Sequence, residues 1–357
     1  MVTNRVLKLL VDAGLESVRC EFVSVDTNPY ALFDDTSTHT DNRAFEHPAT
    51  EAPRAVCVPA DRFSILRYFL DGSRKTYRIG LAYDQGRLLP LIAAQVGVAV
   101  VQRDPKCQKI TPFREYCTFR NLLAVPHTIA NEDLKSYQRT LSDHSPLPIS
   151  LVKYTVKEKQ EPQDSATIVV MDEMRNLEIS TVYRMAEDGC LTDTALLVRD
   201  GPLEFQSRLD KAKFRNVIGI SKSFLTTPKV KSGTKKQDVG MLAASLRFAH
   251  RSLAYRYEYA GNQLAHWYLR IHHGPPRVST PLDGVIKISR LASDAEEEEQ
   301  GMHSDTIDTL SSHILRERNV TAYGKDARWA NHLYPIFLAE EFLKSSFLSD
   351  LAFRGYF

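Results

Sequence analysis

The stretch RYFLDGS at residues 67–73 decides the fold that this 357-residue sequence predicts. Its apolar residues are typical of a buried β-strand, which is expected to end at Asp71, where Gly72 begins a turn. A second stretch, ALLVRDGPL at residues 195–203, repeats this pattern and places Asp200 before a glycine. Carboxylates at the ends of two neighbouring strands can hold divalent cations between them. The two stretches therefore predict a sheet edge that carries a pair of metal-binding aspartates.

Bulk composition excludes several classes of protein. Hydrophobic residues make up 43% of the chain and charged residues 25%, which is ordinary for a globular protein. The 46 basic and 44 acidic residues nearly balance, so any basic surface must be local. The five cysteines contain no C-x-x-C, which argues against a disulfide framework and a zinc ribbon. No signal peptide, membrane span, P-loop or G-x-S-x-G motif is visible, so we expect a cytoplasmic protein that uses other chemistry.

The order of expected elements predicts an α/β fold built on one mixed central sheet. Residues 1–55 read as an N-terminal extension, with an amphipathic helix at 4–15 and a polar loop at 26–55, before a larger domain at 56–357. In that domain, strands are expected at 65–70, 77–83, 88–101, 194–198, 216–220, 267–271 and 285–289, helices at 172–186, 203–214, 241–257, 304–318 and 326–351, a helix plus loop at 131–165, and loops at 226–238 and 296–299.

Asp71 and Asp200 are the first candidates for chemistry, since each follows an apolar run that looks fully buried. The alternative is a simple turn, because Asp-Gly is a common turn pair and also occurs at Asp188 and Asp283. Glu178 borders the apolar face of the expected helix at 172–186 and can complete a three-acid cluster. The alternative for Glu178 is a solvated glutamate, since this residue type is mostly exposed.

Two further blocks carry charge near the expected site. Lys222 follows the strand at 216–220, where a lysine can meet a phosphate or stabilise a leaving oxygen. The alternative is that Lys222 begins the lysine-rich loop at 226–238, a solvated run that is also the local basic patch that a nucleic-acid binder needs. The block WANHLYPIFLAEE at 329–341 predicts a helix with proline in its first turn. Its candidate ligands are Glu340 and Glu341, with ordinary surface glutamates as the alternative.

The order of these motifs resembles the NurA nuclease family. The likeness covers roughly residues 65–350 and implies a ribonuclease H-like fold, with a mixed central sheet flanked by helices, for the domain at 56–357. It also implies a Mn²⁺-dependent (or Mg²⁺-dependent) DNA nuclease that resects ends and cuts single strands. The matching motifs are LDGS at 70–73, R-x-x-E at 175–178, VRDGPL at 198–203, IGISK at 218–222 and YP-x-x-L at 334–338.

The resemblance also implies partners and residue roles. Such enzymes are homodimers that act on DNA with a HerA-type hexameric ATPase, in repair or in antiviral defence. By motif position, Asp71, Glu178 and Asp200 would be metal ligands and Lys222 would contact the substrate. The family has a histidine near the position of Phe342, so Glu340 is expected to take its place as a ligand, with Glu341 and the upstream His332 as the alternatives. This departure motivates an alternative of another class, a catalytically inactive DNA-binding partner that docks on a translocase.

Overall fold

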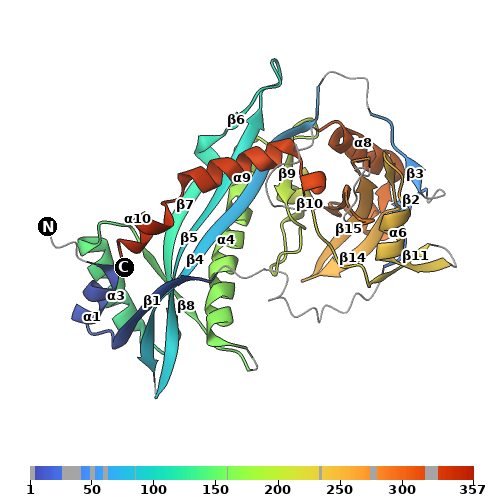
Figure 1. Cartoon of the computed structure of the whole chain (residues 1–357). Coiled ribbons are helices and arrows are strands. Elements are labelled where there is room, and N and C mark those ends of the chain that lie inside the picture. The colour runs from blue at the N-terminus through green and yellow to red at the C-terminus, as the bar shows by residue number, and fades with distance from the viewer. Residues whose placement is uncertain are drawn as a thin grey trace.

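A computed structural model of the chain describes residues 5–25, 42–48, 53–58, 63–84, 86–158, 160–232, 235–273, 280–317 and 329–357. Its central feature is a 13-stranded mixed sheet that runs through the whole molecule (Figure 1). Helices lie on both faces of this sheet. The predicted mixed α/β fold, with one large mixed sheet flanked by helices, is therefore confirmed.

The middle of the sheet consists of three long antiparallel strands followed by two short parallel ones. The antiparallel strands are β4 (Leu66–Asp84), β5 (Arg87–Arg103) and β7 (Thr118–Pro126). β9 (Leu196–Asp200) pairs with β4 in parallel, and β10 (Val217–Ser221) pairs with β9 in parallel. β5 is buried on both faces through most of its length, because its near-continuous apolar run lies under helices on each side.

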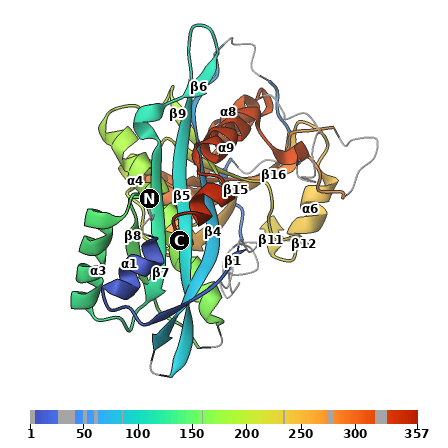
Figure 2. The ribbon, with the colours of Figure 1, turned by 60° about the vertical axis from the view of Figure 1, so that its left-hand side comes forward.

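Two helices cover opposite faces of these strands. α4 (Pro162–Glu187) packs on the face that carries Leu70 and Val98, while α9 (Tyr334–Ser346) packs on the face that carries Phe69. Figures 1 and 2 show both helices running along β4 and β5. Successive side chains of a strand point to opposite faces, so each position of β4 belongs to one helix or the other.

The remaining elements extend the sheet at both ends. Beyond β10 the order continues as β16, β15, β13 and β3, and beyond β7 it ends with β8. Their bounds are α1 Val6–Asp12, β1 Ser17–Ser24, β2 Glu46–His47, β3 Arg54–Ala55, β6 Ile110–Pro112, η1 Arg114–Tyr116, α3 Asn131–His144, β8 Ser150–Tyr154, α5 Lys211–Phe214, β11 Lys229–Ser232, β12 Lys235–Asp238, α6 Val239–Ser245, β13 His250–Arg251, β14 Tyr255–Tyr259, β15 Asn262–Arg270, β16 Val285–Leu291, α7 Ala295–Gln300, β17 Met302–His303, α8 Ser304–Leu315, η2 Trp329–Asn331 and α10 Asp350–Arg354.

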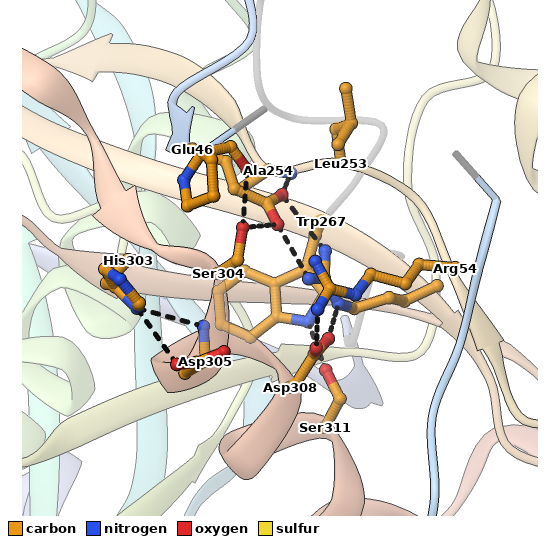
Figure 3. A network of polar contacts seen from close by, with 12 residues as sticks. Glu46, Arg54, Leu253, Ala254, Trp267, His303, Ser304, Asp305, Asp308 and Ser311 are labelled. Atoms are coloured by element: carbon orange, nitrogen blue, oxygen red, sulfur yellow. Dashed lines mark hydrogen bonds and ion pairs between the residues drawn. The ribbon is translucent and has the colours of Figure 1, made fainter. Parts of the chain in front are cut away.

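A buried ionic network ties the N-terminal part of the chain to the C-terminal part (Figure 3). Glu46 accepts bonds from the Arg251 guanidinium at 2.7 and 3.0 Å, from the Ala254 amide at 2.9 Å and from the Ser304 hydroxyl at 2.7 Å. Arg251 also donates to Asp308 at 2.5 Å. Burial alone would raise the pKa of Glu46, but the Arg251 charge and bonds outweigh burial and lower it.

The Asp-Gly pairs at Asp71 and Asp200 behave differently. β9 ends at Asp200 and Gly201 turns with a φ of 98°, so the predicted strand end is confirmed there. The expectation that Asp71 ends its strand is wrong, since β4 continues unbroken to Asp84. Asp71 and Gly72 stay in the sheet because β5 pairs with both of them in register.

Several other local predictions are wrong for physical reasons. The loop expected at 226–238 is the β11–β12 hairpin, and the acidic loop at 296–299 is the helix α7, whose first turn is capped by Asp294. The helix expected at 203–214 forms only as α5. The helix expected at 241–257 ends at Ser245, and the alternating tyrosines that follow form β14, in keeping with the two-residue period of a strand.

The described parts of residues 1–55 pack against the rest of the chain. β1 pairs with β4, and β2 pairs with β17. The predicted helix at 4–15 corresponds to α1. Most of the polar loop expected at 26–55, and the start of the helix expected at 326–351, lie outside the described residues. Among the described helices, none combines the length and apolar character that crossing a membrane requires.

Candidate metal centre

Three neighbouring parallel strands bring charged side chains to one place on the sheet. Leu70 of β4 is in register with Arg199 of β9, so Asp71 and Asp200 are the next residues along two strands roughly 4.8 Å apart. Both lie on the α9 face by alternation. Lys222 follows β10 on the same face, and its Nζ donates to Asp200 Oδ2 at 2.8 Å. The fold thus joins three of the residues that the sequence singled out.

Negative charge exceeds positive charge in this cluster. Asp71 is only 6% exposed. Burial and then the Asp200 charge raise the pKa of Asp71 well above its usual range, against the opposing charge of Lys222, and Glu340 of α9 adds to the rise. Burial by itself would lower the pKa of Lys222, but Asp200 and Asp71 outweigh burial and raise it. The Lys222 ammonium therefore lies among three carboxylates, of which Asp200 pairs with it and Glu340 pairs with Lys344, and the excess negative charge around Asp71 favours a further cation.

Glu178 lies on the other face of the sheet. It projects from α4 and accepts two bonds from Arg199, from Nε at 3.0 Å and Nη2 at 2.6 Å, both at Oε2. The pKa of Glu178 is raised because burial outweighs the Arg199 charge. Its Oε1 faces the backbone of Gly72, where a Cβ would overlap the carboxylate. Glycine at this position lets a charge on the α4 face approach the strand that carries Asp71.

β9 and β1 both flank β4 on the side away from β5. β9 pairs with β4 as far as Leu70 and ends at Asp200, and β1 pairs with β4 from Tyr77 onward. Gly72, which faces the Glu178 carboxylate, lies on β4 between these two ladders.

Gly72→Ala is expected to lower the free energy of unfolding by about 1–3 kcal/mol, because the added methyl group overlaps the Glu178 carboxylate and must displace it from a packed site. Urea denaturation measures this change. In a Glu178→Ala background the same substitution should cost much less, since the carboxylate is gone. An equal cost in both backgrounds would show that Gly72 and Glu178 are not coupled.

The C-terminal candidates separate clearly. The Glu340 carboxylate accepts a hydrogen bond from Lys344 at 2.6 Å. Its negative charge also helps to raise the pKa of both Asp71 and Lys222. Glu341 is exposed. His332 is buried just before α9, and Phe342 packs beside the ring of Phe119. Of the three alternatives in this block, Glu340 is the one whose charge reaches the cluster.

Sequence reasoning missed two residues that support the site. Arg199 is the partner of Glu178, and its position next to Asp200 on β9 places it on the opposite face, a signal that strand alternation contains. Asn331 of η2 donates to the Lys222 carbonyl at 2.9 Å and accepts from the Gly284 amide at 2.6 Å. Asn331 therefore fixes the backbone of Lys222 against the turn that leads into α9.

The donor set suits a hard divalent cation. Mg²⁺ and similar ions often bind through one or two carboxylates, with water and substrate phosphate completing the shell. Asp71 and Asp200 supply such a pair of oxygen donors, and the excess negative charge around them favours a cation. No group of three or more His, Cys, Asp or Glu side chains placed to hold a metal ion occurs within the part of the chain that the structure describes. The two-carboxylate arrangement is the one that fits.

Comparison with known proteins does not assign a function, so the assignment has to rest on the chemistry of this cluster. No model of a known protein family matches the chain, and no curated protein matches it.

Proposed function

We propose that this chain is a metal-dependent deoxyribonuclease of the NurA type. The main observation in support of this proposal is that Asp71, Asp200 and Lys222 come together from three neighbouring parallel strands. The reaction is phosphodiester hydrolysis, at DNA ends and within single strands. We further propose that the protein acts as a homodimer with a HerA-type hexameric ATPase, in DNA repair or antiviral defence.

The strand order supports a ribonuclease H-like core for this proposal. The order β7, β5, β4, β9, β10 places an antiparallel meander beside two parallel strands. α4 lies between the meander and β9 in the chain and packs across the meander. Such a core brings carboxylates from the first and fourth of these strands, in chain order, to one face of the sheet, as the proposed chemistry requires.

Phosphodiester hydrolysis needs a polarised phosphate, an activated water and a stabilised leaving oxygen. A bound Mn²⁺ or Mg²⁺ supplies Lewis acidity and makes water a better nucleophile at neutral pH. Asp71 and Asp200 would hold the ion, Glu340 on α9 would add negative charge near it, and Glu178 would act from the α4 face, where Arg199 binds it. Lys222, now paired with Asp200, is placed to turn its ammonium to the phosphate or the leaving oxygen once a cation neutralises Asp200.

Mn²⁺ is expected to stabilise the protein and to displace a proton from Asp71. Because the folded-state pKa of Asp71 lies above its usual value of 3.8, its contribution to metal-free stability is fully present below pH 3.8 and is lost as pH rises through the raised pKa. Metal affinity should rise over the same window, since the ion competes with the proton. At 100 times the Kd the gain is about 2.7 kcal/mol.

Thermal melts with Mn²⁺ and with EDTA, from pH 5 to 8, measure this effect. The difference between the wild type and Asp71→Asn isolates the contribution of Asp71 from those of other titrating groups. A shift with Mn²⁺ that is the same size in Asp71→Asn would place the ion elsewhere.

The activity itself is tested with purified protein and labelled single- and double-stranded DNA. Product formation with Mn²⁺ or Mg²⁺, and none with EDTA, is the expected result. A protein that gives no product with any divalent ion would contradict the proposed enzyme.

A DNA-binding protein without turnover is the second candidate. Phe342 stands near the position where the NurA family has a histidine, and the Lys222 ammonium already forms an ion pair with the Asp200 carboxylate. This candidate predicts salt-sensitive DNA binding, because phosphate contacts release counterions, without product under any condition. A metal-dependent product ladder would rule it out.

A further inference from the structure

We propose that the β11–β12 hairpin is a guide for a nucleic-acid backbone that leads to the candidate metal centre. The basic strip that carries it consists of Lys229, Lys231 and Lys236, with Arg43 alongside. The identity of the ligand as a single strand of DNA rests on the proposed nuclease function. Figure 1 shows the hairpin beside α6, on the same side of β4 as β10.

The register of the hairpin gathers positive charge on one face. Lys231 pairs directly with Lys236, and Lys229 pairs with Asp238. Lys229 and Lys231 are two residues apart and share a face, while Val230 between them points the other way. All three lysines are exposed. Arg43 forms a parallel bridge with Lys231, so cationic residues stand in a row across three neighbouring chain segments.

Packing and backbone hydrogen bonds hold the hairpin with this face outward. Val230 is 1% exposed and packs in a cluster with Val239 and Tyr255. The Lys231 amide donates to the Asn42 carbonyl at 2.9 Å, and the Asn42 side chain donates to the Lys229 carbonyl at 2.9 Å. A twist of the hairpin would expose Val230 to water, so the lysines cannot turn inward as a group.

Lys231 and Lys236 face each other across the hairpin, while the residue opposite Lys229 is Asp238. Like charges directly opposite each other on two strands destabilise the pair. Between residues that the structure describes, no ion pair involves Lys229, Lys231 or Lys236. An anion with regularly repeated charges would relieve this repulsion. A row of lysines can meet phosphates but reads no base edges, so we infer contact with the backbone and no preference for sequence.

The chain limits how far the strip can lie from the metal centre. Lys229 comes seven residues after Lys222, so their Cα atoms are at most about 25 Å apart. A single strand long enough to span that distance can touch both places, whereas a very short substrate can occupy only the metal centre.

The test is the salt dependence of binding by Lys229→Ala/Lys231→Ala/Lys236→Ala. Fluorescence anisotropy with a labelled 20-nucleotide oligothymidine, in EDTA and at several salt concentrations, gives the slope of log K against log salt. Each lost phosphate contact to a single strand should make the slope less negative by about 0.7, or roughly 2 for the three. The single variant Lys236→Gln should lose about 0.7 and keeps the proposal testable if the triple variant does not fold.

A matched control removes three exposed lysines elsewhere, Lys8, Lys106 and Lys135, with the same change in net charge. The control should keep the wild-type slope. If the hairpin variants keep it too, or if the control loses as much, the strip is not a guide and the proposal falls.

Cleavage separates this proposal from the proposed nuclease function. With Mn²⁺, the hairpin variant should cut the 20-nucleotide strand at least tenfold more slowly below saturation, and should hydrolyse thymidine 5′-p-nitrophenyl phosphate like the wild type. Equal loss on both substrates would contradict a guide and indicate damage to the centre. A wild type that cuts nothing, with the slope change still present in the variant, would overturn the nuclease function and support the strip as a nucleic-acid site.

Discussion

Asp71→Asn is expected to lower Mn²⁺-dependent DNA cleavage by at least about 1000-fold, which corresponds to roughly 4 kcal/mol of transition-state stabilisation. Asp200→Asn should do the same, because the two carboxylates stand side by side on β4 and β9 and would share the ion. An amide keeps the shape of the side chain but removes the charge that holds a divalent cation. Single-turnover cleavage of labelled single-stranded DNA measures the effect.

The folded state of these variants provides the control. Asp71 is buried with a raised pKa, so removal of its ionisable group should leave the metal-free protein equally or more stable at neutral pH. Loss of activity cannot then be ascribed to unfolding. Asp188→Asn is a matched substitution, because Asp188 also precedes a glycine but bonds Tyr116 away from the cluster. Cleavage by Asp71→Asn within tenfold of the wild type would contradict its proposed role.

Arg199→Ala is expected to lower the free energy of unfolding by about 3–5 kcal/mol. The substitution leaves the Glu178 carboxylate buried without its cation, and that uncompensated charge is costly. The stacking of Arg199 over the Phe205 ring is lost as well. The pKa of Glu178, already raised, should rise further, so the loss grows as pH increases above its usual value of 4.5. Urea denaturation at pH 5 and pH 8 measures both effects.

A double substitution tests the cause of that loss. Arg199→Met with Glu178→Met removes both charges and keeps similar volume, so it should recover most of the stability that Arg199→Ala loses. The double variant should still cleave poorly if Glu178 contributes to the metal centre. An Arg199→Ala protein that unfolds within 1 kcal/mol of the wild type would show that the pair is solvated.

Local sequence signals predict part of this structure well. The strands expected at 194–198 and 216–220 are continuous apolar runs and form as β9 and β10, and the helix expected at 172–186 forms as the second part of α4, which already begins at Pro162. Alternation along parallel strands is enough to place Asp71 and Asp200 on one face once β4 and β9 are known to be neighbours. That neighbour relation is not local, and in the sequence it depends on the repeated Asp-Gly context.

Other features depend on contacts that no local pattern contains. β4 runs through Asp71 and Gly72 because β5 pairs with both of them. The sequence does not predict the β11–β12 hairpin, because its lysines are typical of a solvated loop and Val230 is the only large apolar residue in β11. The face on which Glu178 lies follows from how α4 packs on the sheet and from Arg199, 21 residues further along the chain.

Diffraction from crystals soaked in MnCl₂ tests the central claim most directly. Data collected at the manganese absorption edge should give an anomalous peak within bonding distance of carboxylate oxygens of both Asp71 and Asp200, and the peak should vanish in Asp71→Asn. A fully soaked crystal with no peak between these two side chains, or with manganese bound only elsewhere, would contradict the account.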